Sequence, residues 1–337
     1  MLNKCEISII TPIYNSSGTL KQYLAAIFNS SYKNFEVIIV DDSSNNDPSE
    51  ITKDYSITYR RLLKRSGSAF ARNAGSEIAQ GEILLFIDPD IIIYPDTLQK
   101  VKDVFLNHPE ISALIGSYDD LPGAKNFTSQ FKFLYHHYIH QREPEYVTSF
   151  WTGCGAIKKE IFMKLGKFDT NFFNRLNSVN DIELGYRISK GQYKIYNANH
   201  IQVKHLRKLS FFEWFKTDIL DRALPWMKII LKKKDLTPKL NINWVEYIST
   251  ILAGTAVLFL FLSLRNILFL KIASIFCASI LFLNYGVIKF FIIKRGIFFA
   301  TISIFYLYLF YLYCGISVLL AIILYFLETI GIPIKIW

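Results

Sequence analysis

The strongest constraint on how this chain can fold is a set of three long apolar segments near its C-terminus. They lie at about residues 245–264, 267–293 and 296–327 of the 337. Each exceeds the ~18 apolar residues with which an α-helix crosses a bilayer. The third has 32 uncharged residues, which favours one tilted helix, or one kinked at Gly315, over two helices too short to cross. The sequence therefore predicts a transmembrane region at 241–337.

Positive charge is concentrated beside these segments. The net charge is +10, yet residues 1–199 hold 22 basic and 22 acidic residues, whereas residues 200–240 hold ten basic and four acidic ones. Cations next to apolar segments predict contact with anionic lipid headgroups rather than with nucleic acid. Lys232–Lys234 and Lys294–Arg295 fall on one side of three helices, which predicts a cytoplasmic N-terminal domain at the inner cell membrane. Arg265 and Lys271, on the other side, argue against it.

Residues 209–240 are predicted to form an interfacial segment between a domain at 1–208 and the transmembrane region. Aromatic residues such as Trp214 and Trp226 interleave there with Lys216, Arg222 and Lys228. Aromatic and basic residues on one helix are typical of an element that lies at a membrane surface. An amphipathic helix packed on the N-terminal domain is the alternative.

The N-terminal part alternates between strand and helix patterns. Strands are predicted at 7–13, 35–40, 57–63 and 83–87, with helices after residue 18 and at 67–79. This alternation predicts a Rossmann-like α/β fold with a mostly parallel sheet. Further patterns predict helices at 97–106, 126–139, 158–165 and from 180, and strands at 111–118, 147–157 and 192–196.

Two of these strands end in paired acids. The apolar run Ile83–Ile87 stops at Asp88-Pro-Asp90, and the second strand stops at Asp41-Asp42. Open α/β sheets bind ligands at the carboxyl ends of their strands. Carboxylates one residue apart across a turn can share a divalent cation with a diphosphate. The alternative is a solvated Asp-Pro-Asp turn.

Five stretches, in order and spacing, together resemble the family 2 glycosyltransferases of the GT-A fold over about residues 5–230. They are Ile9-Ile10-Thr11-Pro12-Ile13-Tyr14-Asn15, Val37-Ile-Ile-Val-Asp41-Asp42-Ser-Ser44, Ala71-Arg72-Asn73-Ala-Gly75, Asp88-Pro-Asp90 and Asn180-Asp181-Ile-Glu-Leu-Gly-Tyr-Arg187. The stretches His205-Leu-Arg-Lys-Leu-Ser-Phe-Phe and Asp221-Arg-Ala-Leu-Pro-Trp226 are similar to membrane-anchored bacterial members. The resemblance implies a GT-A catalytic domain.

The resemblance implies a nucleotide site at the ends of the first two strands, with Arg72 near the base or the diphosphate. An acid that accepts a hydrogen bond from a uracil N–H is sound chemistry. A turn acid that caps the next helix is the alternative for the Asp pair, and a surface ion pair is the alternative for Arg72. The implied nucleotide-binding residues are Thr11, Pro12, Tyr14, Asp41, Asp42, Arg72 and Asp88.

The resemblance also implies a divalent cation, Mn²⁺ or Mg²⁺, bound by Asp90 and Asp88. The cation neutralises the departing nucleoside diphosphate. A histidine often joins the metal or the diphosphate in GT-A enzymes, and His205 is the candidate with His200 in reserve. The histidines within 136–140 have no acid at HExxH spacing and are interpreted as packing or surface residues.

The acceptor side is implied by two further stretches. A glycine-rich loop, with Trp151, Gly153, Cys154 and Gly155, resembles the floor of the sugar and acceptor site, where glycine lets the backbone approach a ligand. A β-bulge is the alternative. Asp181 is implied as the general base, with an N-cap as the alternative. Asn180 replaces the acid that usually precedes it, and Glu183 is assigned to the acceptor loop.

The resulting hypothesis is an inverting, metal-dependent, hexosyltransferase-like enzyme. It moves a sugar from a nucleotide-sugar donor, expected to be a UDP-sugar, to a hydroxyl of a lipid or lipid-linked acceptor at the cytoplasmic membrane face. A polyprenyl-phosphate glycosyltransferase is the alternative, although a phosphate acceptor needs no base such as Asp181. A processive synthase lacks support because no Gln-x-x-Arg-Trp motif is present. A catalytically inactive nucleotide-sugar-binding scaffold is the alternative from another class.

Overall fold

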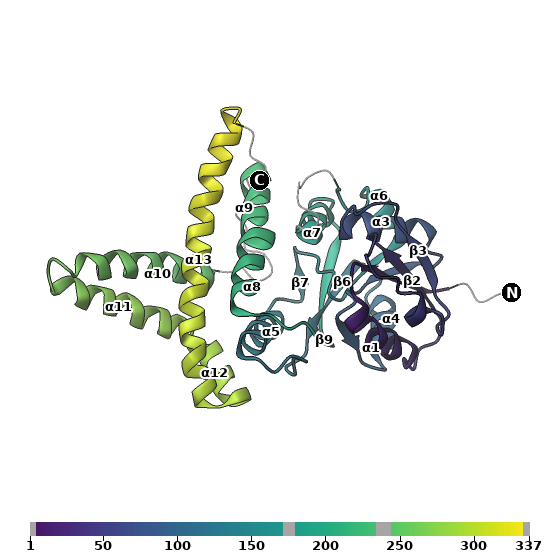
Figure 1. The fold of residues 1–337 in the computed structure, drawn as a ribbon, viewed down its shortest axis with the longest axis horizontal. Helices are drawn as coiled ribbons and strands as arrows, with labels where there is room; N and C mark the ends of the chain where they lie inside the picture. Colours follow the sequence, from purple (N-terminus) through teal and green to yellow (C-terminus); the bar gives the residue numbers. More distant parts are fainter. Residues whose placement is uncertain (1–4, 171–178, 234–243, 333–337) are drawn as a thin grey trace. The chain divides into compact units, whose positions relative to one another are not determined.

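The computed structural model describes residues 5–170, 179–233 and 244–332. The chain divides into two compact units, Met1–Lys208 and Leu209–Trp337, which are described separately (Figure 1). The end of the predicted interfacial segment, 234–240, and the first residues of the predicted transmembrane region, 241–243, lie outside the described residues.

The first half of the N-terminal unit is the parallel part of one sheet. Strands β1 (Ile7–Ile13), β2 (Phe35–Asp41), β3 (Thr58–Arg61) and β4 (Ile83–Phe86) lie side by side in the order β3-β2-β1-β4 and all run in one direction. Helices α1 (Ser17–Phe28), α2 (Ser49–Thr52) and α3 (Ser68–Ile78) connect them. A Cβ on Gly75 would lie 2.6 Å from Ile10, so glycine lets α3 pack closely on β1. The predicted alternation is confirmed.

The second half of the sheet is mixed. The order continues from β4 through β8 (Gly155–Lys158), β6 (Ile111–Tyr118), β9 (Lys194–His205) and β5 (Ile91–Ile93), with β7 (Tyr146–Val147) paired to β9. Strands β6 and β9 run with β1–β4, whereas β5, β7 and β8 run against them. The sheet is therefore mostly parallel, as predicted. The described part of the unit also contains the helices α4 (Thr97–Asn107), α5 (Phe127–His140), α6 (Lys159–Lys164) and α7 (Asn180–Lys190).

Two predicted strands differ from those observed, and one observed strand was not predicted. Residues 147–157 are not one strand, because β7 pairs with β9 while β8 lies between β4 and β6. The run after Asp90 forms a separate strand, β5, antiparallel to β9. The last strand, predicted at 192–196, extends to His205. This extension brings His205 opposite Ile91, beside the Asp88-Pro-Asp90 turn.

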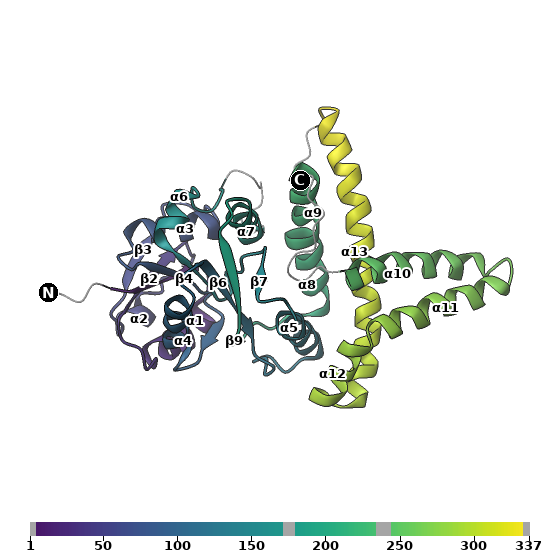
Figure 2. The same ribbon diagram turned by 180° about the vertical axis from the view of Figure 1, so that it is seen from behind.

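The C-terminal unit is helical (Figure 2). It begins with α8 (Phe211–Lys216), the π-helical segment η1 (Thr217–Ala223) and α9 (Leu224–Lys233). Ser210 and Glu213 form a capping box that starts α8. After the undescribed residues come α10 (Trp244–Leu262), α11 (Leu268–Leu283), α12 (Tyr285–Arg295) and α13 (Ile297–Thr329).

Two of the described helices, α10 and α13, are long and apolar enough to cross a membrane. The predicted segment 267–293 is divided into α11 and α12, which are bent by 62° relative to each other, and this pair is a third candidate if it counts as one span. The predicted segment 296–327 forms one helix of 33 residues, α13. By length and composition, the described part of the chain therefore has two or three candidate spans.

Candidate functional site

The predicted acids gather at one edge of the sheet. Strand β1 lies between β2 and β4, so the end of β1, Asp41 at the end of β2 and the turn after β4 are neighbours. The register pairs Ile13 with Asp41, and the N–H of Asp42 donates to the carbonyl of Ile13 at 2.8 Å. Thr11 is buried in β1 and hydrogen-bonds to the hydroxyl of Tyr23. The carboxyl edge of these strands is therefore the candidate site.

The two acids after β2 differ in their partners. Asp41 is buried and accepts from the N–H of Ser44 at 2.9 Å and from the hydroxyl of Tyr59 at 2.8 Å. Asp42 accepts from the N–H groups of Ser66 and Gly67 at 2.6 and 2.8 Å. Asp42 thus holds the loop that leads into α3, but it does not cap a helix, because both donors precede the first residue of α3. Asp41 keeps lone pairs that can accept from a ligand.

The loops after β1 and β2 are conformationally strained. Asn15 and Ser43 have positive φ angles of 52° and 64°. They are held by hydrogen bonds, since the N–H of Asn15 donates to Ser44 Oγ at 2.9 Å. Such backbone often marks ligand sites. Beside Asn15, the Arg65 guanidinium lies 4.0 Å from the centre of the Tyr14 ring. Sequence patterns do not point to Arg65 or Tyr59, because neither lies in a motif.

Arg72, Asp88 and Asp181 come from three different elements and act on one another. Arg72 Nη2 of α3 lies 2.6 Å from Asp88 Oδ1 after β4. Arg72 is buried, and its Nε has no hydrogen-bond partner among the described residues. Asp181 lies in the first turn of α7. Burial raises the pKa of Asp181, the positive charge of Arg72 opposes that rise, and the negative charge of Asp88 adds to it.

The main chain of Thr152 also donates a hydrogen bond to Asp181, which joins the glycine-rich loop to the predicted base. The N–H of Ile182 donates to Asp181 Oδ1 at 2.9 Å. Both hydrogen bonds favour the ionised form and orient the carboxylate. The structure thus brings the predicted base and the loop of the acceptor side together with Arg72 and Asp88.

Asp90 and His205 face each other across the β5–β9 pair. Asp90 Oδ2 lies 3.9 Å from His205 Nε2, and the Asp90 carbonyl accepts from the N–H of Leu206 at 2.8 Å. The His205 ring stacks on Phe133 with ring centres 4.1 Å apart. His205 Nδ1 accepts from the N–H of Arg207 at 3.0 Å. In a neutral ring that places the proton on Nε2, so His205 presents a donor toward Asp90.

The residues present fit a divalent cation held mainly by carboxylates. Burial raises the pKa values of Asp88 and Asp90 above their usual range, so neither negative charge is fully compensated by the protein. Carboxylate oxygens are ligands for Mg²⁺ and Mn²⁺, and Mg²⁺ keeps waters and substrate phosphates in its shell. Across 5–170, 179–233 and 244–332, no group of three or more His, Cys, Asp and Glu side chains forms a complete metal site.

The predicted third ligand fits that cation less well. His205 would have to move its ring proton to Nδ1, against the N–H of Arg207, before Nε2 could bind a metal. The reserve candidate, His200, has its pKa lowered by burial and by the charges of Lys100 and His108. Neither of the Asp-Pro-Asp carboxylates appears among the charges that shift it.

The glycine-rich loop packs around its own tryptophan. A Cβ on Gly153 would lie 2.3 Å from a ring atom of Trp151, and a Cβ on Gly155 would lie 2.3 Å from the Trp151 carbonyl. The Trp151 ring meets Tyr118 and His140 edge-on at 4.7 and 5.0 Å. The glycines are therefore needed to seat Trp151. Cys154 is buried, which raises the pKa of its thiol to about 12 and makes it unreactive.

Glu183 serves the packing of α7. It is buried, and its two carboxylate oxygens accept a bifurcated hydrogen bond from the single N–H of Arg187 Nε, at 3.1 and 2.9 Å. Arg187 Nη2 in turn donates to the carbonyl of Lys167 at 2.7 Å. The pair thus fixes the turn after α6 against α7.

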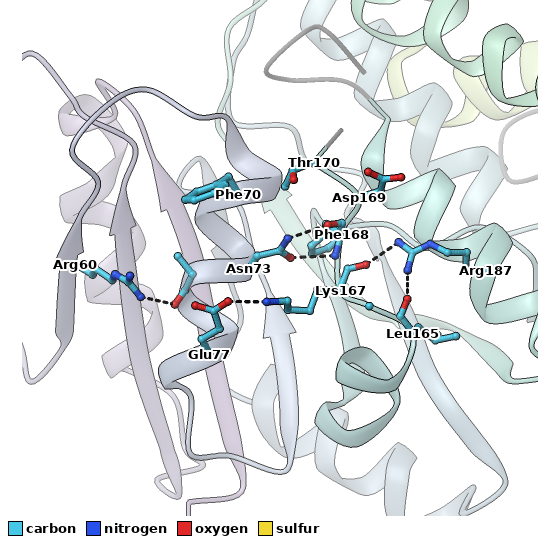
Figure 3. A pocket seen from close by; sticks show the side chains of 12 residues that line it. Arg60, Phe70, Asn73, Glu77, Leu165, Lys167, Phe168, Asp169, Thr170 and Arg187 are labelled. Carbon is cyan, nitrogen blue, oxygen red and sulfur yellow. Dashed lines mark hydrogen bonds and ion pairs between the residues drawn. The ribbon is translucent and has the colours of Figure 1, made fainter. Parts of the chain in front are cut away.

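An open pocket of about 480 Å³ is lined by the same turn and by Arg187 (Figure 3). Asn73 of α3 bridges it, donating to the Phe168 carbonyl at 2.8 Å and accepting from the Phe168 N–H at 3.0 Å. Arg72 approaches the Phe168 ring, with 5.8 Å between its guanidinium carbon and the ring centre. Asp41, Asp88, Asp90 and Asp181 do not line this pocket. It is therefore a neighbour of the acidic site and not part of it.

Comparison with known proteins supports this location. The family profile described as Glycosyl transferase family 2 matches residues 8–166, which carry β1 to β8 and the acids at their ends. A glycosyltransferase of Haemophilus influenzae is 38% identical over 113 residues, 32% of this chain and 45% of the relative. Another from the same organism is 31% identical over 176 residues, 49% of this chain and 56% of the relative. The match thus spans about half the length of these relatives.

A solved structure extends the likeness to the fold of nearly the whole chain. It is a mannosyltransferase from Pyrobaculum calidifontis in complex with GDP-Man and Mn²⁺. The TM-score is 0.57 at 19% identity, and the alignment covers 94% of this chain and 88% of the mannosyltransferase. At that identity the likeness concerns the fold, which is GT-A.

Proposed function

Residues 8–166 of this chain match glycosyltransferase family 2, and from that premise we propose that the chain transfers a sugar from a nucleotide-sugar donor to a hydroxyl of a lipid or lipid-linked acceptor. The observation that carries the proposal is the convergence of Arg72, Asp88 and Asp181. Arg72 can pair with the diphosphate, Asp88 lies on the donor side and Asp181 can act as the base on the acceptor side, and the three meet at one edge of the sheet. Transfer with inversion needs the departing diphosphate and the base on opposite sides of the anomeric carbon.

The donor is assigned to the ends of β1 and β2. Asp41 is buried and held rigidly by Tyr59 and Ser44, so it can accept from the N–H of a uracil at little cost in ordering. The Arg65–Tyr14 stack beside it adds a cationic, aromatic surface for the nucleotide. We therefore assign a UDP-sugar as the donor. The Pyrobaculum mannosyltransferase binds GDP-Man, so GDP-sugars are the first competitors to test.

The chemical step is assigned to Asp181. Its raised pKa makes it a stronger base than an exposed aspartate, and its carboxylate is oriented by Thr152 and Ile182. It removes the proton of the acceptor hydroxyl as that oxygen attacks the anomeric carbon. Arg72 faces the departing diphosphate, and His205 donates its Nε2–H to the same group.

Asp90 and Asp88 would hold a divalent cation. When bound, such a cation neutralises the charge of the leaving diphosphate. Asp88 would be shared between the cation and Arg72, because Arg72 already contacts one of its carboxylate oxygens. Asp90 is therefore proposed as the main protein ligand.

The acceptor is assigned to the membrane because apolar helices follow the transferase unit in the chain, after the segment of α8, η1 and α9. The cations of residues 200–240 support a cytoplasmic catalytic unit at the inner membrane. A lipid-linked hydroxyl at that face fits both features.

The test is a donor screen with purified, detergent-solubilised protein, Mn²⁺ and a lipid extract, followed by mass spectrometry of the lipid fraction. Wild type should transfer from one nucleotide sugar, and Asp181→Asn should lose nearly all transfer. Asp96→Asn, which changes an exposed acid paired with Lys100, is the matched control and should keep full activity. Near-normal turnover by Asp181→Asn would instead favour a polyprenyl-phosphate acceptor, which needs no base.

A further inference from the structure

The charged layer formed by α8, η1 and α9 packs along α13 from Tyr306 to Glu328. Asp218 of η1 accepts hydrogen bonds from Trp214 Nε1 and from the hydroxyl of Tyr313 on α13. Leu224 packs against Ala321. Lys232 Nζ lies 3.0 Å from a carboxylate oxygen of Glu328, near the end of α13. The charged layer is thus joined to α13 at three positions along that helix (Figure 1).

These contacts cover a length of α13 comparable with a bilayer. Fifteen residues separate Tyr313 from Glu328, which is about 22 Å at ~1.5 Å per residue. The hydrocarbon core of a bilayer is ~30 Å thick. If α13 crossed it, the layer beside it would be drawn into the hydrocarbon as well. That layer carries Lys216, Asp218, Asp221, Arg222, Lys228 and Lys232, and charges inside the hydrocarbon are costly.

The first part of α13 is too short to cross alone. Residues 297–305, before the first aromatic contact of Tyr306 with Trp214, amount to no more than half of the ~18 residues required. Although α13 is long and apolar enough to cross a membrane, the charged layer of α8, η1 and α9 that packs against it is not compatible with a position inside the hydrocarbon.

The exposed residues of α13 fit a helix that lies in the membrane surface. Ile316, Leu319, Leu320, Ile323 and Phe326 are exposed and follow helical spacing along one stripe. Ser317 and Ala321 are buried. An apolar stripe can enter the acyl chains while the charged layer remains among the headgroups.

The α10–α11 hairpin is close to the length that a crossing needs. At ~1.5 Å per residue its helices of 19 and 16 residues are about 28 and 24 Å long, so α11 crosses only if the residues that flank it also enter the membrane. Lys271 and Arg265 are exposed near the tip of the hairpin, where charged side chains can reach the surface, and the buried Glu246 lies at its start. Figures 1 and 2 show the hairpin running across α13, so the hairpin and α13 cannot both follow the membrane normal.

The bend after α11 is fixed by a buried amide. Asn284 Nδ2 donates to Ser249 Oγ on α10 at 3.1 Å, and Asn284 Oδ1 accepts from the hydroxyl of Tyr311 on α13 at 2.6 Å. Three helices therefore meet at this residue, and the chain turns by 62° into α12. Polar side chains commonly join helices in membranes. Helix α12 carries Lys289, Lys294 and Arg295, which returns further cations to the side of the charged layer.

We propose that α10 and α11 cross the bilayer as a hairpin, and that α8, η1, α9, α12 and α13 lie on one membrane face against anionic phospholipid headgroups. In this arrangement, the cations of α8 to α9 and of α12 share one face, and Arg265 and Lys271 lie on the other. The basic excess on one face satisfies the positive-inside bias. Residue 330 then lies on the same side as the N-terminal unit, whereas a crossing α13 would place it on the opposite side.

The first test is cysteine labelling in oriented membrane vesicles with a membrane-impermeant maleimide. The background variant replaces Cys5, Cys277 and Cys314 with Ser and keeps the buried Cys154. Single cysteines are placed at three exposed positions by Asp54→Cys, Asn266→Cys and Ile330→Cys. Asp54→Cys and Ile330→Cys should label from one side and Asn266→Cys from the other. Labelling of Ile330→Cys with Asn266→Cys, or of Asn266→Cys with Asp54→Cys, would overturn the proposal.

A second measurement does not depend on vesicle orientation. Spin labels at Ile316→Cys and Ile330→Cys lie fourteen residues apart, about 21 Å along the helix and on nearly the same face. In vesicles containing phosphatidylglycerol, collision with oxygen and with a polar nickel chelate reports the depth of each label. Equal, shallow depths are expected from a surface helix. A difference approaching the full separation would show that α13 crosses.

Discussion

Replacing Arg72 with Met should destabilise the N-terminal unit by about 2 kcal/mol. Arg72 makes a charge-assisted hydrogen bond to Asp88 at 2.6 Å, and such bonds contribute about 1.5–3 kcal/mol. The larger cost of breaking a fully buried pair, about 3–5 kcal/mol, does not apply, because the Asp88 side chain is 36% exposed and water can partly solvate it. For a unit of this size, the loss corresponds to a melting temperature lower by about 4–8 °C.

The double variant Arg72→Met/Asp88→Asn separates the ion pair from simple loss of packing. The amide introduced by Asp88→Asn would carry no charge that needs a partner, so most of the lost stability should return. Thermal unfolding of the four proteins at pH 7, followed by circular dichroism, gives the coupling directly. Lys100→Met is the control, since its pair with Asp96 is exposed at both ends and should be worth less than about 1 kcal/mol. If the double variant melted no higher than Arg72→Met, the proposed pairing would be refuted.

The same replacement should also move the pH dependence of activity. Arg72 lowers the pKa values of both Asp88 and Asp181. Without it both values rise further, so a higher pH is needed to ionise the base. The acidic limb of the kcat/KM profile should therefore shift upward in Arg72→Met. An unchanged limb combined with lower activity would mean that Arg72 acts on the donor alone.

Three further outcomes are expected. Asp181→Asn should lower kcat by about 10²–10⁴-fold, and wild-type activity should fall as the pH drops through the raised pKa of Asp181, measured by initial rates. Asp90→Asn should melt higher than wild type at pH 7, because the raised pKa of Asp90 means that its ionised form destabilises the folded state. The difference in melting temperature should vanish toward pH 3.8. Mn²⁺ should raise the melting temperature of wild type more than that of Asp90→Asn. Gly153→Ala, whose Cβ would lie 2.3 Å from the Trp151 ring, should lose activity in the same assay, whereas Gly18→Ala, with nothing within 4 Å, should not.

The first half of the fold could be predicted because its signals are local. Each of β1, β2 and β4 is an apolar run that stops at a polar turn, so the acids at the strand ends are found together with the strands. The second half depends on pairing between distant segments. Strand β8 lies between β4 and β6, and nothing in residues 155–158 specifies those neighbours. The alternation Ile201, Val203 and His205 is the available signal for the length of β9.

The hydrogen-bond partners of the site residues could not be predicted from the sequence either, because they come from distant segments of the chain. Asp42 accepts from the backbone of Ser66 and Gly67, 24 and 25 residues later, and backbone donors leave no mark in the sequence. The bend at Asn284 likewise depends on Ser249 and Tyr311, which come from two other helices. Hydropathy shows that these segments are apolar but cannot show which of them pack against charged neighbours.

The charges of the site support a donor that binds together with a cation. Arg72 faces two carboxylates, Asp88 and Asp181, and His205 Nε2 lies 3.9 Å from Asp90. A nucleoside diphosphate would bring further negative charge into a site whose acids already have raised pKa values. Arg72 cannot balance both the acids and the diphosphate, since one guanidinium carries a single charge. A divalent cation between Asp90 and the diphosphate would reverse this repulsion. We therefore expect that binding of the donor together with a cation relieves the repulsion among these carboxylates.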